Sequence, residues 1–497
     1  MSPTSSASYK SSDPDLNIDD LIQSGMFIGG VWAPSSSGQT FEVLNPADNA
    51  FIGRVPNGNE QDVLNAIESA SRNFQAWSRL TAGHRAILMQ SWHELILEHL
   101  DPLSQLLTTE QGKPITESIT EIRYAASFVE WFAEQAKRVN GEIIPPHLED
   151  KRVLVYRQPI GVVAAITPWN FPAAMITRKV APAIAAGCTV VLKPAPQTPL
   201  TALAIAKLAE VAGIPAGVIN VVTTLDSEMC GKVFCREHKV AKISFTGSTR
   251  VGKLLMAQAA PTLKKLSLEL GGNAPFLVFE DANVDDAVDG LITSKFRNSG
   301  QTCICANRII VQESIAEEFV RKLVKEAEGL RLGNGLMRGV DQGPLINSEA
   351  IERLDALVQD AVSKGAKVIT GGKRHALGGT FFEPTVLTGV TSDMRVTSEE
   401  IFGPLAPILT FRTEEEAIAL ANNTRYGLAA YFYTNDLNRF WRVSEQLESG
   451  VVGHNSGMIS TEIAPFGGVK ESGIGREGSH HGIAEYTELK YVCSQVS

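Results

Sequence analysis

The spacing of apolar residues changes along the chain near residue 160. Between residues 60 and 107, apolar side chains recur every three or four positions, which is the pattern of amphipathic helices. From residue 161 onward, continuous apolar runs of strand length alternate with helical stretches. Strands joined by helices in this way predict β-α-β units around a parallel sheet. The apolar runs lie at 161–166, 189–194, 218–223, 240–247 and 263–270.

A second segment with α/β periodicity follows Gly271 and Gly272. Its apolar runs again alternate with stretches of helical spacing, so the chain as a whole predicts an α/β fold that includes a doubly wound parallel sheet. A chain of 497 residues also exceeds what one hydrophobic core usually supports. The predicted strands of the second segment lie at 275–279, 308–312 and 366–370, its helices at 284–297, 314–328 and 347–364, and two further units at 409–447.

The run at 152–158 alternates apolar and polar residues, as a half-exposed strand does. We expect this strand to pair with the C-terminal run at 486–492 in a small sheet. Such a protruding sheet is suited to association between subunits, so we expect a homo-oligomer, either a tetramer or a dimer.

Composition narrows the class of protein. A net charge of −10 argues against nucleic acid or an anionic membrane as the main partner. No apolar run approaches the ~20 residues that span a bilayer. Six cysteines with no C-x-x-C pair and no Cys/His set argue against a disulfide framework and against a metal site. We expect a reducing, cytoplasmic location; the acidic, Ser-rich N-terminus matches neither a signal peptide nor a convincing transit peptide, although a mitochondrial location stays open.

One cysteine stands out by its position in FRNSGQTCIC, residues 296–305. Cys303 lies where an apolar helical run gives way to Asn298, Ser299 and Gly300, and loops at the ends of regular elements often carry function. Taken alone, a cysteine is most often a small buried apolar residue. A thiol in such a loop can be a nucleophile if its pKa is lowered or a base takes its proton.

Polar residues follow several of the predicted strands, at the edge where ligands bind in open α/β sheets. Asn170 follows the first strand and Lys193 ends the second. Ser248 opens a helix after the fourth strand, and helix N-termini favour anions. Glu269 lies in the apolar fifth strand, where burial raises a carboxyl pKa toward that of a general base. Each residue also has an ordinary interpretation: a turn residue, a solvated charge, a helix cap or a structural salt bridge.

Together, FRNSGQTC, LELGG, PWNFP, KPA-x-x-TP, FTGST and EIFGP resemble the motifs of NAD(P)-dependent aldehyde dehydrogenases. The resemblance covers nearly the whole chain, residues 23–493. It implies that Cys303 is the nucleophile, that Glu269 is the general base and that Asn170 holds an oxyanion. It further implies that the nicotinamide cofactor contacts Thr167, Trp169, Lys193, Pro196, Gly247, Ser248, Gly252, Leu270, Glu400 and Phe402.

The resemblance also implies how the chain is divided. The expected parts are a flexible N-terminal arm at 1–24, a cofactor-binding domain at 25–141 and 162–270, a catalytic domain at 271–470, and oligomerisation segments at 142–161 and 471–497.

Within the family, the closest resemblance is to succinate-semialdehyde dehydrogenases, and Arg178, Arg297 and Ser460 carry it. The matching residues of that subfamily bind the distal carboxylate of the substrate, which suits the planar, bidentate fork of arginine. Either arginine could instead form a surface or intersubunit salt bridge. We expect oxidation of succinic semialdehyde to succinate, a step of 4-aminobutyrate degradation. Glutaric semialdehyde or an aliphatic aldehyde is the alternative substrate.

Cofactor choice is predicted from Pro196, three residues after Lys193. NAD-preferring relatives often carry Glu at this position, where it contacts the adenosine ribose. Without that carboxylate the 2′-phosphate of NADP meets no local negative charge, so we expect NADP to be preferred, with NAD possible.

Cys305 raises the possibility of regulation. A Cys303–Cys305 disulfide would silence the nucleophile under oxidation, and related enzymes suggest such a switch. In extended chain, however, residues two apart point to opposite faces, so the loop would have to rearrange before a disulfide could close.

Two other classes stay open at this point. A Cys-dependent thiol hydrolase or acyltransferase commonly pairs the cysteine with a histidine, and no histidine lies in these motifs. A non-catalytic protein descended from such an enzyme is the other class, and the presence of Cys303, Glu269 and Asn170 together argues against it.

Overall fold

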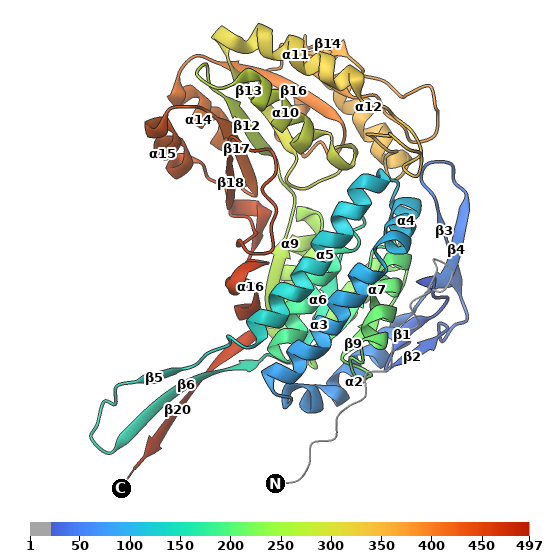
Figure 1. The fold of residues 1–497 in the computed structure, drawn as a ribbon, viewed down its shortest axis with the longest axis vertical. Helices are drawn as coiled ribbons and strands as arrows, with labels where there is room; N and C mark the ends of the chain where they lie inside the picture. The colour runs from blue at the N-terminus through green and yellow to red at the C-terminus, as the bar shows by residue number, and fades with distance from the viewer. Residues whose placement is uncertain (1–20, 497) are drawn as a thin grey trace.

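The computed structural model describes residues 21–496. These residues form two α/β halves and a narrow arm that projects from one of them (Figure 1). The flexible arm expected at 1–24 lies outside the described residues except for its last four. Of those four, Leu21 is fully buried, so the packed core already includes part of the range assigned to the arm. Within the described part of the chain, no helix is long and apolar enough to cross a membrane.

The predicted strands of the first half are present and lie side by side in the order β11-β10-β7-β8-β9. They pair in parallel, and the register joins Ile166 to Lys193, Ile166 to Phe245, and Thr246 to Glu269. The carboxyl ends of these strands therefore meet at one edge of the sheet. Antiparallel strands extend both sides of it. The bounds are β1 Met26–Ile28, β2 Val31–Ala33, β7 Val162–Ile166, β8 Thr189–Lys193, β9 Ile219–Val221, β10 Val240–Thr246, β11 Lys265–Glu269 and β19 Gly473–Ile474.

The continuous apolar run of β7 follows from burial on both faces. Val163 and Ala165 belong to one hydrophobic cluster, whereas Val162 and Ala164 belong to another. A strand that is covered on both sides needs an apolar residue at every position. The helices of this half are α2 Glu60–Ser78, α3 Ala82–Glu98, α4 Leu100–Gln111, α5 Ile115–Ala136, α6 Ala174–Ala186, α7 Pro199–Val211, α8 Ser227–Arg236 and α9 Thr249–Ala259.

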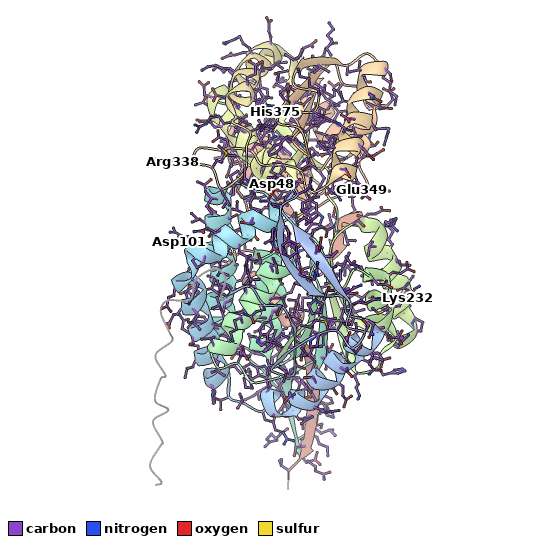
Figure 2. All side chains as sticks on the ribbon, turned by 90° about the vertical axis from the view of Figure 1, so that its right-hand side faces the viewer. Asp48, Asp101, Lys232, Arg338, Glu349 and His375 are labelled. Carbon is purple, nitrogen blue, oxygen red and sulfur yellow. The ribbon has the colours of Figure 1, made fainter. Side chains whose placement is uncertain are left out.

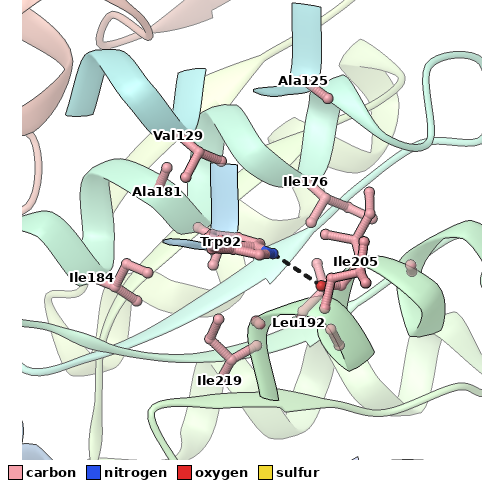
Figure 3. Close-up of a cluster of buried hydrophobic side chains, with 14 of the residues drawn as sticks. Trp92, Ala125, Val129, Ile176, Ala181, Ile184, Leu192, Ile205 and Ile219 are labelled. Carbon is pink, nitrogen blue, oxygen red and sulfur yellow. Dashed lines mark hydrogen bonds between the residues drawn. The ribbon is translucent and has the colours of Figure 1, made fainter. Parts of the chain in front are cut away.

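Trp92 lies at the centre of the larger cluster (Figure 3). Its ring packs among Val129 of α5, Ile176 of α6 and Leu192 of β8. The indole Nε1 donates a hydrogen bond of 3.1 Å to the carbonyl of Ile205, so the polar atom of this side chain is satisfied inside the core. The contact ties α3 to α7 and fixes both helices against the sheet.

The second half contains a seven-stranded sheet in the order β14-β15-β16-β13-β12-β17-β18. Most of its pairs are parallel, and only β14 runs antiparallel to its neighbour. Its strands are β12 Ala274–Val278, β13 Ala306–Gln312, β14 Lys367–Thr370, β15 Thr385–Thr388, β16 Leu405–Phe411, β17 Ala429–Tyr433 and β18 Val451–His454, and its helices are α10 Val284–Lys295, α11 Ala316–Gly329, α12 Ser348–Ser363, α13 Arg395–Ser398, α14 Glu414–Asn422 and α15 Leu437–Gln446.

The arm is a three-stranded antiparallel sheet, and it confirms the predicted pairing of the C-terminal strand (Figure 1). β20, Thr487–Gln495, pairs along its full length with β6, Lys151–Pro159, and β5, Glu142–Ile144, covers the other edge of β6. Ile143, Leu489 and Tyr491 are well exposed on it. The remaining elements are the hairpin of β3 Thr40–Leu44 and β4 Phe51–Pro56, and α16 Ser479–Ala484.

Most charged side chains lie on the outside of the molecule, as the labelled Asp101, Lys232 and Glu349 illustrate (Figure 2). Charged groups are rarely buried unless they are paired or have a function. The exceptions therefore deserve individual explanation. Buried charged residues include Lys113, Glu121, Arg178, Lys179, Lys193, Glu269, Lys295 and Glu477.

Candidate active site

A cavity of about 490 Å³ opens between α5, α6 and the loop that follows α10. Cys303, Arg178, Arg297 and Ser460 all line it, so residues far apart in the sequence meet at one site. Asn170 and Glu269 are not among the lining residues. Asn170 instead contacts the loop before Cys303, and the charge of Glu269 acts on the Cys303 thiol.

The loop before Cys303 has an unusual backbone. The helix predicted at 284–297 ends at Lys295, and a short 3₁₀ turn follows in which Asn298 and Ser299 have φ of 51° and 55°. Left-handed backbone at two successive non-glycine residues is strained and persists only when the surroundings fix it. Glu117 accepts from the Asn298 N–H at 2.8 Å, and the Ser299 hydroxyl donates to the carbonyl of Gly343 at 2.8 Å.

The Cys303 thiol is partly exposed to the cavity and is protonated at neutral pH. Burial raises its pKa to about 12, and the negative charges of Glu400 and Glu269 act in the same direction. Arg178 opposes them. Since the thiolate is the reactive form, this cysteine needs either a base or a change in its surroundings to become a strong nucleophile.

Glu269 lies at the end of β11 and is buried, and neither of its carboxylate oxygens has a hydrogen-bond partner in the described chain. Burial, followed by repulsion from Glu477, raises its pKa well above the ordinary value, and Arg178 and Lys179 oppose this shift. Gly467 leaves room for the carboxylate, because a Cβ there would lie 3.0 Å from Oε1. The result is an unpaired carboxyl group that can hold and release a proton.

An ion triad that the sequence did not reveal lies beside Glu269. Glu477 pairs with Arg178, at 2.6 Å from Nε to Oε2, and also with Lys179. Arg178 is therefore partly committed to a structural salt bridge, the ordinary interpretation of an arginine there. Its guanidinium also packs 4.1 Å from the centre of the Phe466 ring, and its Nη2 has no partner in the described chain. The sequence feature that could have predicted this triad is the adjacent pair of Arg178 and Lys179 on an otherwise apolar helix.

Asn170 is held in place from both ends. Its Nδ2 donates to the carbonyl of Gln301 at 3.0 Å, which uses one of its two N–H groups. The backbone carbonyl of Asn170 accepts from Lys113 Nζ at 2.7 Å and from Asn298 Nδ2 at 3.0 Å. The side chain of Asn170 thus points at the Cys303 loop with one N–H to spare.

The Lys113 ammonium belongs to a buried polar network. It donates to Glu121 Oε2 at 2.6 Å, and both side chains are excluded from solvent. Glu121 Oε1 in turn accepts from the N–H groups of Ala173 and Ala174 at the start of α6, at 2.9 and 3.3 Å. The network joins α5, the start of α6 and the Cys303 loop. Sequence reasoning missed it, although Glu117 and Glu121 recur at four-residue spacing on an apolar helix.

The residues expected to bind cofactor lie at the carboxyl edge of the first sheet. The Lys193 Nζ, which is buried, donates to Ser227 Oγ at 2.6 Å, and the Thr167 hydroxyl is buried without a partner in the described chain. Ser248 caps α9 by accepting from the Val251 N–H at 3.4 Å. Pro196 follows β8 and is half-buried.

Close packing explains the glycines at this edge. A Cβ on Gly252 would lie 2.4 Å from Leu270 Cδ2, and a Cβ on Gly247 would lie 2.5 Å from the Phe245 ring. Any larger residue at either position would therefore displace a neighbouring side chain.

Glu400 and Phe402 approach this edge from the second half. Glu400 Oε1 accepts from the Gly272 N–H at 3.0 Å, and burial raises the pKa of this carboxyl to about 7. Phe402 adopts a left-handed φ of 52° and meets Trp169 edge to face, with 5.6 Å between the ring centres. A donor set of hydroxyls, an amine and a helix N-terminus, beside two aromatic rings, fits a dinucleotide.

Cys305 points away from the cavity. Its thiol is buried and lies 3.7 Å from the carbonyl of Lys295, and it is not among the lining residues. Both cysteines are free thiols. The chain turns at this point, since the Cys305 N–H donates to the carbonyl of Thr302 at 3.1 Å, so the alternation expected of extended chain does not apply here. The Cys303–Cys305 disulfide stays a prediction.

Comparison with known proteins bears on this site. Residues 32–492 match the model of the Aldehyde dehydrogenase family. The chain is 56% identical to a 3-sulfolactaldehyde dehydrogenase of Pseudomonas putida, covering 96% of this chain and 98% of the relative. It is 55% identical to a mitochondrial succinate-semialdehyde dehydrogenase of Arabidopsis thaliana, with 96% and 90% covered.

A solved structure has the same fold. The crystal structure of an NADP dependent enzyme from E. coli aligns with a TM-score of 0.95 at 52% identity, over 96% of this chain and 99% of the other. The predicted α/β architecture is confirmed by this match and by the sheets described above.

Alkylation of Cys303 by iodoacetamide should accelerate with pH, because only the thiolate reacts and the pKa is about 12. We expect the rate to rise about tenfold per pH unit between pH 7 and pH 9. Mass spectrometry of the labelled peptide separates this reaction from that of the exposed Cys493, and Cys303→Ala supplies the blank. A rate that is already level at pH 7 would contradict a protonated thiol.

The Glu121→Gln variant should lower the free energy of unfolding by about 3–5 kcal/mol, because the buried Lys113 ammonium loses its counter-charge. Urea denaturation measures the change. Glu134→Gln, which breaks an exposed pair with Lys137 on the same helix, is the matched control and should cost about 0.5 kcal/mol or less. Equal losses in the two variants would show that the buried network has no special weight.

Proposed function

The chain belongs to the aldehyde dehydrogenase family, and from this premise we propose that it oxidises succinic semialdehyde to succinate, with NADP preferred as hydride acceptor and NAD possible. The observation that carries the choice of substrate is the pair of arginines in the cavity. Arg178 Nη2 and Arg297 Nε are both buried and unpaired in the described chain, and both residues line the cavity that holds Cys303. Buried, unpaired guanidinium nitrogens suit an anionic ligand.

The proposed reaction begins at Cys303. The sulfur of Cys303 bonds to the aldehyde carbon, and the carbonyl oxygen becomes an oxyanion. The free N–H of Asn170 Nδ2 and the backbone N–H of Cys303 are the donors for this oxyanion. One such donor is worth about 2.7–4 kcal/mol of barrier. The contacts that fix Asn170 support this role, because a donor stabilises the transition state only if it is already in position.

Glu269 is the proposed base. Its raised pKa makes it a stronger base than an ordinary carboxylate. It takes a proton first from the Cys303 thiol, releases it to solvent, and later takes a second proton from water. The bound nicotinamide supplies the hydride acceptor. The carbon then remains on Cys303 as a thioester, water attacks it with its proton passing to Glu269, and the thiolate leaves as the carboxylic acid forms. The balance is one aldehyde and one water to one carboxylate, one hydride and two protons.

The cofactor residues proposed for this chain are those that the resemblance implied, and the unpaired Thr167 hydroxyl, the Lys193 amine and the capped start of α9 support them. Pro196 supports NADP, because no carboxylate at that position repels a 2′-phosphate. The similar E. coli structure of an NADP dependent enzyme supports the same choice.

A second substrate class is favoured by specific relatives. A glutarate-semialdehyde dehydrogenase of Pseudomonas aeruginosa is 54% identical over 95% of this chain and 98% of the relative. Glutaric semialdehyde and 3-sulfolactaldehyde both carry an anionic group beyond the aldehyde, so the two arginines suit them as well. The two arginines therefore support an aldehyde with a distal anion as the substrate class, and succinic semialdehyde is the member of that class that we propose.

The Arg297→Ala variant should raise KM for succinic semialdehyde by about ten- to hundredfold, since a hydrogen bond to a charged group is worth about 1.5–3 kcal/mol. Butanal has the same chain length without the carboxylate, and its KM should be nearly unchanged. Arg412→Ala, which removes an exposed arginine paired with Glu313, is the control. Equal losses on both aldehydes would sink the substrate assignment, and a panel that includes glutaric semialdehyde separates the two candidates.

The Pro196→Glu variant should lower kcat/KM for NADP by at least about tenfold while changing that for NAD much less, because the new carboxylate repels a 2′-phosphate. Absorbance of the reduced cofactor measures both. Pro196→Ala separates the charge from loss of the ring and should keep the wild-type preference. A wild-type enzyme with the higher kcat/KM on NAD would overturn the cofactor proposal.

A further inference from the structure

Tyr124 of α5 lies in the wall of the cavity and carries an unexplained hydroxyl. The residue lines the cavity, yet its Oη is buried and has no hydrogen-bond partner in the described chain. A buried hydroxyl without a partner is unfavourable, and such groups call for a bound ligand or water. Much of the nearby wall is apolar, including Phe171, Phe296 and Phe466, so a phenylalanine would fill the same place without that cost.

The ring of Tyr124 is fixed in position. It meets Phe128 edge to face, with 4.8 Å between ring centres, and the guanidinium of Arg178 lies 5.6 Å from the centre of the same Phe128 ring. The ring can therefore move little, and its hydroxyl points where packing directs it.

Both cations and carboxylates act on the hydroxyl. Burial raises the pKa of Tyr124, the positive charges of Arg178 and Arg297 oppose that rise, and Glu462 and Glu477 add to it. The phenol is thus a neutral donor at ordinary pH, close enough to both arginines to feel their charge.

The unpaired polar atoms of the lining residues include Arg178 Nη2, Arg297 Nε and Tyr124 Oη. Each can donate a hydrogen bond, and guanidinium nitrogens cannot accept one. Two guanidinium nitrogens, which can only donate, together with a hydroxyl that can donate, suit an oxyanion.

We propose that the Tyr124 hydroxyl donates a hydrogen bond to the distal carboxylate of the substrate and so helps select an acidic aldehyde over a neutral one. This inference rests on the proposed function. It adds a neutral donor to the two charged ones, and it explains why a tyrosine occupies a largely apolar wall. Tyr124 does not touch the reacting carbonyl, so it acts in binding and not in bond making.

The test is Tyr124→Phe, which removes only the hydroxyl. With succinic semialdehyde we expect KM to rise about tenfold or more while kcat stays within about twofold, and with butanal neither constant should change. Tyr156→Phe, at an exposed site on β6, is the matched control. Equal changes on both aldehydes, or no change on either, would overturn the inference.

A double variant tests whether Tyr124 and Arg297 share one ligand group. If both bind the same carboxylate, the effect of Tyr124→Phe should shrink once Arg297 is replaced by alanine. Full additivity would argue against a shared carboxylate. If Arg297→Ala discriminates between the aldehydes and Tyr124→Phe does not, this inference fails alone. If the wild-type enzyme shows no preference for the acidic aldehyde, the proposed substrate itself fails.

Discussion

The buried pair of Lys113 and Glu121 is the interaction on which the geometry of the site depends. Burying two charges is costly, and their attraction compensates only when the remaining donors and acceptors are also satisfied. Here they are: the ammonium also binds the carbonyl of Asn170, and the carboxylate also binds the start of α6. One ion pair therefore fixes the candidate oxyanion donor relative to the helix that carries Arg178. An apolar pair could pack the same helices together, but it could not orient the Asn170 peptide.

The charges around Cys303 determine how readily its thiol ionises. Glu400 and Glu269 act against ionisation of the thiol, and Arg178 acts in its favour. The carboxylates oppose ionisation of the thiol, so a free thiolate is scarce in the resting protein. Reactivity then depends on proton transfer at the moment of reaction, which protects a nucleophile that is partly open to solvent.

Much of the fold could be predicted from the sequence, because runs of strand length alternate with helical stretches, and a strand buried on both faces, such as β7, is an unbroken apolar run. The pairing of β6 with β20 was equally predictable, since both are strand-length runs outside the main sheets. The left-handed turn at Asn298 and Ser299 was not. Nothing in the local sequence demands it, and contacts from Glu117 and Gly343 impose it.

The candidate site was predictable only in part. The strand-end residues meet because parallel strands end together, which follows from topology alone. Partners across long sequence separations do not follow from it. The pairing of Arg178 with Glu477 gives that arginine a structural role, and the Cys305 thiol is buried against the carbonyl of Lys295. The Tyr124 hydroxyl stands out because it has no hydrogen-bond partner in the described chain, and the Lys113 ammonium because it has buried partners. Neither property can be predicted from the sequence.

The C-terminal segment gives the molecule a built-in order of assembly. Glu477 joins Lys179 and Arg178 across about three hundred residues, and β20 completes the arm with the last described strand. During synthesis the N-terminal parts emerge and fold first. Until the final residues have left the ribosome, two buried cations lack their counter-charge and β6 lacks a neighbour. A chain that lacks these residues therefore lacks the counter-charge of Lys179 and Arg178 and the neighbour of β6.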